Sequence, residues 1–97
     1  MVNPLGPLPS RLRPFVRDGR ISAMPAKHAV RLLLLDRVAQ AFEPGRRYPE
    51  AAVNAILKDL YDDYVTLRRY LVDEELLSRT NDGTYWRSGG TVPVSGS

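Results

Sequence analysis

The stretch DDYVTLRRYLVDEELLSR, residues 62–79, decides the fold, because it has the pattern of an amphipathic helix that leads into a strand. Its apolar residues recur every three or four positions, the spacing of one helix face. Asp63 stands where an N-cap carboxylate would accept from the amide near Thr66, so a helix is predicted from Asp63 to about Glu74. Acidic and basic side chains both occur here. The helix therefore either reads a nucleic acid duplex or packs with its arginines held by carboxylates.

The residues after this helix predict a β-hairpin. The segments 76–80 and 84–87 carry apolar, β-branched and aromatic residues, and the triplet Asn81-Asp82-Gly83 lies between them. Glycine supplies the positive φ that such a turn requires. Tyr85 and Trp86 alternate in direction along the second strand, and we expect Trp86 to be the one that covers the core.

Two further helices precede residue 62. Pro25 suits the first turn of a helix, and apolar residues then sweep a wide arc as far as Phe42. Residues 25–42 are therefore expected to form a helix at the centre of the core, or one that also serves an oligomer contact. Residues 49–60 form the other helix, on the i, i+3, i+4, i+7 spacing of Val53, Ile56, Leu57 and Leu60. Residues 20–24 are expected to form a short edge strand after a turn at Asp18-Gly19.

The order strand, helix, helix, helix, hairpin predicts an α+β fold of the winged helix-turn-helix type. It has three helices, a C-terminal β-hairpin wing and a short N-terminal edge strand. A chain of 97 residues with 43% apolar content makes one domain, placed at residues 15–87. Residues 1–14 hold four of the eight prolines and are expected to be a disordered tail, and residues 88–97 a flexible one.

Composition narrows the classes of function. The chain has no cysteine, no apolar run near the roughly 20 residues of a membrane helix, and no secretory signal pattern at its start, so we expect a cytoplasmic protein. His28 is the only histidine, and no nucleophile or phosphate-loop motif is present. The spacing of Asp59, Asp62 and Asp63 fits no calcium loop. We expect no enzyme, no cofactor, no metal and no small-molecule substrate.

The net charge of +3 is unevenly distributed. Residues 1–47 hold nine Lys or Arg and three Asp or Glu, whereas residues 48–97 hold five and eight. Twelve of the 14 basic residues are arginine. This bias suits phosphate contacts, and it also arises from genomic base composition. The arginines at 11, 13, 17 and 20 are either a minor-groove arm or part of a solvated tail.

A helical projection divides the third helix into two faces. Arg68 falls on the inner face, where an arginine needs a structural acceptor such as a carboxylate or helix-end carbonyls. Thr66, Arg69 and Tyr70 face outward with Asp73. The residues expected to contact double-stranded DNA, through bases or phosphates, are Lys27, Arg46, Arg47, Thr66, Arg69, Tyr70, Arg79 and Arg87. The alternative for Arg69 is an i, i+4 pair with Asp73 on a solvated face.

Three segments carry a family resemblance: GRISAMPAK, FEPGRRYPEAAVN and TLRRYLVDEELLSRTNDGTYW. Residues 15–87 resemble the bacterial domain of unknown function 2087. The resemblance implies a small winged-helix-like fold and an association with transcription regulators, and it implies no established biochemical activity.

The expected function is a DNA-binding transcriptional regulator that acts as a homodimer or with a partner regulator. A protein-interaction module of the same fold is the alternative. In that case the acidic face of the third helix and Leu33 contact another protein, and DNA is not touched.

Overall fold

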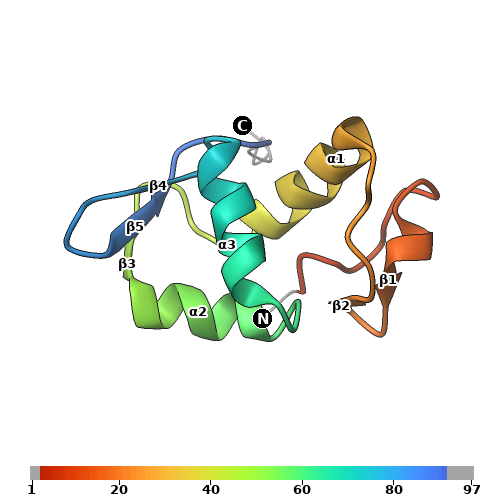
Figure 1. Ribbon diagram of the computed structural model, residues 1–97, viewed down its shortest axis with the longest axis horizontal. Helices are drawn as coiled ribbons and strands as arrows, with labels where there is room; N and C mark the ends of the chain where they lie inside the picture. Colours follow the sequence, from red (N-terminus) through yellow and green to blue (C-terminus); the bar gives the residue numbers. More distant parts are fainter. Residues whose placement is uncertain (1–2, 92–97) are drawn as a thin grey trace, which may run out of the picture.

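Three α-helices and two small antiparallel sheets make up residues 3–91, the part of the chain that this computed structural model describes (Figure 1). The helices are a short 3-10 helix η1 (Arg13–Phe15) and the α-helices α1 (His28–Ala39), α2 (Glu50–Lys58) and α3 (Tyr64–Asp73). The first sheet has β1 (Val16–Arg17) and β2 (Arg20–Ile21). The second sheet has β3 (Arg47–Pro49), β4 (Leu77–Arg79) and β5 (Thr84–Arg87). Within these described residues no helix is long and apolar enough to cross a membrane.

Helix α3 begins and ends as local chemistry dictates. Asp63 accepts from the Thr66 amide at 3.2 Å and from the Thr66 hydroxyl at 2.8 Å, which confirms the predicted N-cap. At the other end Leu76 N donates to Leu71 O at 2.9 Å, and Glu75 has a φ of 60°. This is a Schellman motif, in which a residue with a left-handed conformation ends the helix, and both leucines are buried.

The second sheet has three strands where a two-stranded hairpin was predicted. Its order is β3-β5-β4, and Tyr48 in β3 pairs with Tyr85 in β5. The predicted hairpin is confirmed as β4 and β5, with Gly83 at a φ of 87° in the turn. Strand β3 was missed because residues 47–49 are short and end in proline, so that they read as a turn leading into α2.

The two faces of this sheet differ in exposure. Tyr48, Tyr85 and Leu77 face the core, and Tyr85 is only 1% exposed. Trp86 lies on the outer face, half-buried, with the Arg47 guanidinium 4.8 Å from its ring centroid. The prediction that Trp86 covers the core was therefore wrong, because the register with β3 turns Tyr85 inward.

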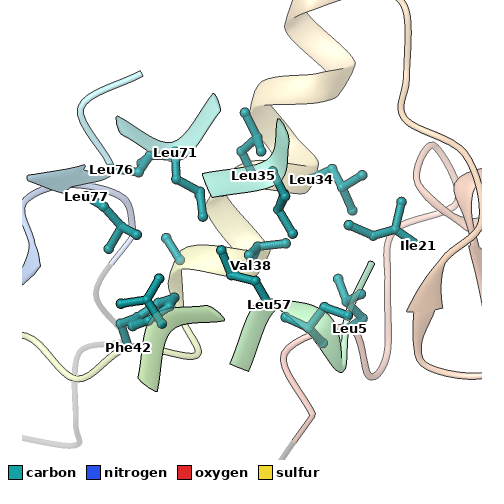
Figure 2. Close-up of a cluster of buried hydrophobic side chains, with 14 of the residues drawn as sticks. Leu5, Ile21, Leu34, Leu35, Val38, Phe42, Leu57, Leu71, Leu76 and Leu77 are labelled. Atoms are coloured by element: carbon teal, nitrogen blue, oxygen red, sulfur yellow. The ribbon is translucent and has the colours of Figure 1, made fainter. Parts of the chain in front are cut away.

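Helix α1 is the centre of the core, as its wide apolar arc predicted. Leu34, Leu35 and Val38 are fully buried. They meet α2, α3, the start of β4 and the N-terminal region through Leu57, Leu71, Leu77 and Leu5 (Figure 2). Buried side chains of α1, α2, α3, the second sheet and the N-terminal segment thus form one cluster, and the helices lie between the second sheet and the N-terminal segment (Figure 1).

The N-terminal segment, expected to be a disordered tail, packs on the domain in its described part, residues 3–14. Leu5 and Leu12 are buried, and Arg37 in α1 donates to the carbonyls of Pro4 and Pro7 at 3.4 and 2.5 Å. Proline has no N–H, so a proline-rich segment has fewer backbone donors for its carbonyls, and a guanidinium can bind them. Of the expected C-terminal tail, residues 92–97 lie outside the described residues.

Candidate nucleic-acid interface

The solvent-facing stripe of α3 consists of Val65, Arg69 and Asp73, each four positions from the next. Among the residues that the structure describes, Arg69 has no ion pair. The alternative in which Asp73 holds Arg69 is thus not formed, and the Arg69 guanidinium faces solvent. Of the outward residues predicted on α3, Arg69 is the one whose polar group stays free.

Thr66 and Tyr70 are engaged within the domain. The Thr66 hydroxyl donates to the Asp63 carboxylate that caps α3. Tyr70 is half-buried, and the Arg31 guanidinium of α1 lies 4.9 Å from its ring centroid. The helical projection turned Tyr70 outward, but α1 crosses this side of α3 and covers part of the ring.

Arg68 has the structural role that the sequence predicted. Its side chain is 17% exposed, and Nη2 lies 3.6 Å from Glu50 Oε1. Nη1 donates to Asn54 Oδ1. Glu50 and Asn54 were not predicted as partners, although their i, i+4 spacing places them on one face of α2. That spacing is the only signal of this contact in the sequence.

The same carboxylate connects the helices to the hairpin. Tyr85 donates from its hydroxyl to Glu50 Oε1 at 3.1 Å, and the Arg79 guanidinium lies 5.5 Å from the Tyr85 ring centroid. Burial, followed by the hydrogen bond to Glu50, raises the pKa of Tyr85 above its ordinary value. Arg79, at the end of β4, thus lies over a ring that is bonded to α2, and its side chain is exposed.

Arg87 does not lie on the surface, contrary to the expectation that it contacts phosphate. It is 8% exposed and donates to Gly89 O at 3.1 Å, to Phe42 O at 3.3 Å and to Thr91 O. Its cross-strand partner is Leu77, which is buried, so the register points Arg87 toward the core. Arg87 is therefore a structural residue that binds main-chain carbonyls.

Three predicted phosphate contacts remain exposed. Arg46 lies 5.0 Å from the Tyr48 ring centroid and 3.8 Å from the Glu43 carboxylate. Arg47 stacks on Trp86 at the outer face of the sheet. Lys27 precedes α1, whose first turn lies at the far end of the molecule from the second sheet (Figure 1). Arg46, Arg47 and Arg79 thus belong to the second sheet or the turn before it, Arg69 to α3, and Lys27 lies elsewhere.

The acidic turn between α2 and α3 is partly neutralised by Arg20. Its Nη1 donates to Lys58 O and Asp59 O, both at 2.9 Å, and its Nη2 lies 2.5 Å from Asp62 Oδ1. A guanidinium at the C-terminus of α2 binds unpaired carbonyls and offsets the negative end of the helix dipole. Asp62 is therefore a smaller electrostatic obstacle to DNA than its charge alone indicates. In residues 3–91 no group of three or more His, Asp or Glu is arranged to hold a metal ion.

Comparison with known proteins gives one match. No curated protein and no solved structure matches the chain. Residues 20–87 match the DUF2087 family, which is described as an uncharacterized protein conserved in bacteria. The matched range begins at Arg20 and ends at Arg87, and it includes α1, α2, α3 and the whole second sheet. The chain therefore belongs to the DUF2087 family.

Proposed function

We propose that the protein is a DNA-binding transcriptional regulator with a winged-helix fold. The sheet order supports the fold: β3 lies between α1 and α2 in the chain, pairs with β5, and the β4–β5 hairpin follows α3. In such a fold the second and third helices form the helix-turn-helix, and the hairpin is the wing. Helix α3 is then the helix that enters the major groove.

The observation that carries the proposal is the free guanidinium of Arg69 in the middle of the exposed stripe of α3. An arginine there donates two hydrogen bonds to the edge of a guanine in the major groove. Arg79 supports it from the hairpin, where its exposed guanidinium lies over the Tyr85 ring. Base readout is thus assigned to Arg69 and phosphate contact to Arg79.

The proposed footprint has four contacts, Arg46, Arg47, Arg69 and Arg79. Of the other four predicted contacts, Arg87 is buried and Tyr70 is partly covered. The Thr66 hydroxyl is bonded to Asp63, and Lys27 lies at the other end of the molecule. The three phosphate contacts among them, Arg46, Arg47 and Arg79, predict a log–log salt slope of roughly −3. A homodimer in the cytoplasm would double this footprint, and neither a catalytic step nor a cofactor belongs to the proposal.

Fluorescence anisotropy with mixed genomic duplex at low and high salt tests the proposal. We expect binding at low salt that weakens steeply with added salt. Arg69→Ala should remove sequence preference, and Arg79→Ala should weaken binding to all duplexes alike. Lys27→Ala, which removes an exposed cation outside the proposed footprint, is the matched control and should leave binding unchanged. Absence of binding at low salt would sink the proposal.

A protein-interaction module is the second candidate, favoured by two exposed apolar side chains. Leu33 in α1 is 41% exposed and Val65 at the start of α3 is 42% exposed. Val65 shares the α3 stripe with Asp73, so a partner there would present apolar and basic groups. Sedimentation of the wild type and of Val65→Ser separates this candidate from DNA binding: loss of association in the variant, with no duplex bound by either, favours it.

A further inference from the structure

A depression of about 490 Å³ lies between the N-terminal segment and the start of α1. Its walls are apolar, and they come from Phe15, Pro25, Ala26 and Val30. Arg11 and Lys27 complete the lining. The volume is that of a small organic molecule. This site is separate from α3 and the hairpin, and the proposed function makes no use of it.

Both cations of the depression are available to a ligand. Arg11 and Lys27 are exposed, and within residues 3–91 neither side chain has an acceptor or an ion pair. No carboxylate lines the depression. Two unpaired cations over apolar walls give this surface a charge that only an anion complements.

The surroundings keep the potential positive. Between residues 3 and 35 the chain carries six Lys or Arg, and Asp18 is the only acidic residue. Of the acidic groups on other elements, Asp62 is paired with Arg20 at 2.5 Å, and Glu74 contacts the His28 ring at 2.8 Å. The first turn of α1 adds to this field, since it holds no acidic side chain and no side chain caps it.

We propose that this depression binds a small organic anion that consists of one carboxylate on an apolar body. Arg11 and Lys27 hold the carboxylate, Arg11 through parallel N–H donors and Lys27 as a point charge. The apolar body lies against Phe15, Pro25 and Val30. Inorganic phosphate has the negative charge but no apolar part, and a neutral aromatic alcohol has the apolar part but no charge. The site should therefore bind the organic anion more tightly than either of these.

An NMR titration of the ¹⁵N-labelled full chain tests the site, with benzoate, benzyl alcohol and inorganic phosphate as separate probes. Benzoate should shift the amides of Phe15, Ala26, Lys27 and Val30 with a dissociation constant of about 1 mM or tighter. Benzyl alcohol and phosphate should each bind at least about tenfold more weakly at the same amides. Equal shifts from benzyl alcohol, equal shifts from phosphate, or no shift with benzoate would each overturn the proposal.

Variants assign the roles within the depression. Lys27→Gln and Arg11→Gln should each weaken benzoate binding about fivefold to tenfold, whereas Lys58→Gln, an exposed lysine on α2, should leave it unchanged. Ala26→Trp fills the depression and should abolish binding while both cations remain, and Ala55→Trp on the exposed face of α2 is its control. Undiminished binding in Ala26→Trp, with native amide dispersion, would place the ligand elsewhere. DNA binding does not enter any of these readouts.

Discussion

The Tyr85 hydroxyl and the Glu50 carboxylate, 3.1 Å apart, join the hairpin to the first turn of α2. The same carboxylate lies 3.6 Å from Arg68 of α3, so one acidic side chain is shared by all three elements that the proposed DNA interface requires. This contact therefore helps to fix the hairpin relative to α2 and α3.

Replacing Tyr85 with phenylalanine should lower the free energy of unfolding by about 1 kcal/mol, because a half-buried hydrogen bond is lost and the ring stays in place. Urea denaturation followed by circular dichroism measures the change. Tyr61→Phe is the matched control, since the Tyr61 hydroxyl makes no hydrogen bond within residues 3–91. Equal midpoints for Tyr85→Phe and the wild type would show that the bond adds no stability.

The raised pKa of Tyr85 predicts an alkaline limit to stability. Burial and the bond to Glu50 favour the neutral hydroxyl in the folded state. The raised pKa therefore contributes to the free energy of unfolding, and this contribution is fully present below the ordinary tyrosine pKa of 10.0. That stability is lost as the pH rises through the higher folded value. Urea midpoints measured from pH 8 upward should fall less steeply in Tyr85→Phe than in the wild type. A fall of the same steepness in both proteins contradicts the assignment.

Glycine at position 75 should stabilise the protein. Glu75 has a φ of 60°, a left-handed conformation that costs an L side chain about 1 kcal/mol and glycine little. We expect Glu75→Gly to raise the free energy of unfolding by about 0.5 kcal/mol, because a more flexible unfolded chain offsets part of the gain. Ala55→Gly, at an exposed position inside α2, should instead destabilise the protein by about 1 kcal/mol. The reverse order of the two melting temperatures would contradict the strain at Glu75.

Removal of the Arg87 side chain should destabilise the fold by about 2 to 3 kcal/mol, since a buried guanidinium binds three main-chain carbonyls there. Arg47→Ala, which removes an exposed arginine of the same sheet, should cost less than about 1 kcal/mol. Thermal melts of the two variants make the comparison. If Arg87→Ala melts like Arg47→Ala, Arg87 is not held as the structure describes.

The N-terminal segment should contribute to stability through Leu12. Leu12→Ala is expected to cost about 2 kcal/mol or more, the range for a buried leucine, whereas Leu33→Ala should cost under about 0.5 kcal/mol because Leu33 is exposed. Urea denaturation of both variants measures this difference. An unchanged free energy of unfolding in Leu12→Ala would show that residues 3–14 do not stabilise the domain.

The sequence predicted those elements whose signals are local. The Asp63 cap and the glycine turn at Gly83 depend on residues within four positions, and both are confirmed. Strand β3 and the packed N-terminal segment depend on partners far along the chain, which periodicity does not reveal. The candidate site shows the same division. The helical projection correctly predicted that Arg68 faces inward, whereas Tyr70 is partly covered by Arg31, which lies on another helix.

Strand β3 has a consequence for self-association. It is an edge of the three-stranded sheet, and its last residue, Pro49, has no N–H to offer an incoming strand. Arg47 adds a charge on the same short edge. These two side chains disfavour edge-to-edge sheet growth at β3, the route by which a small exposed sheet templates aggregation. A dimer would thus be expected to form through helix surfaces rather than by extending the sheet at this edge.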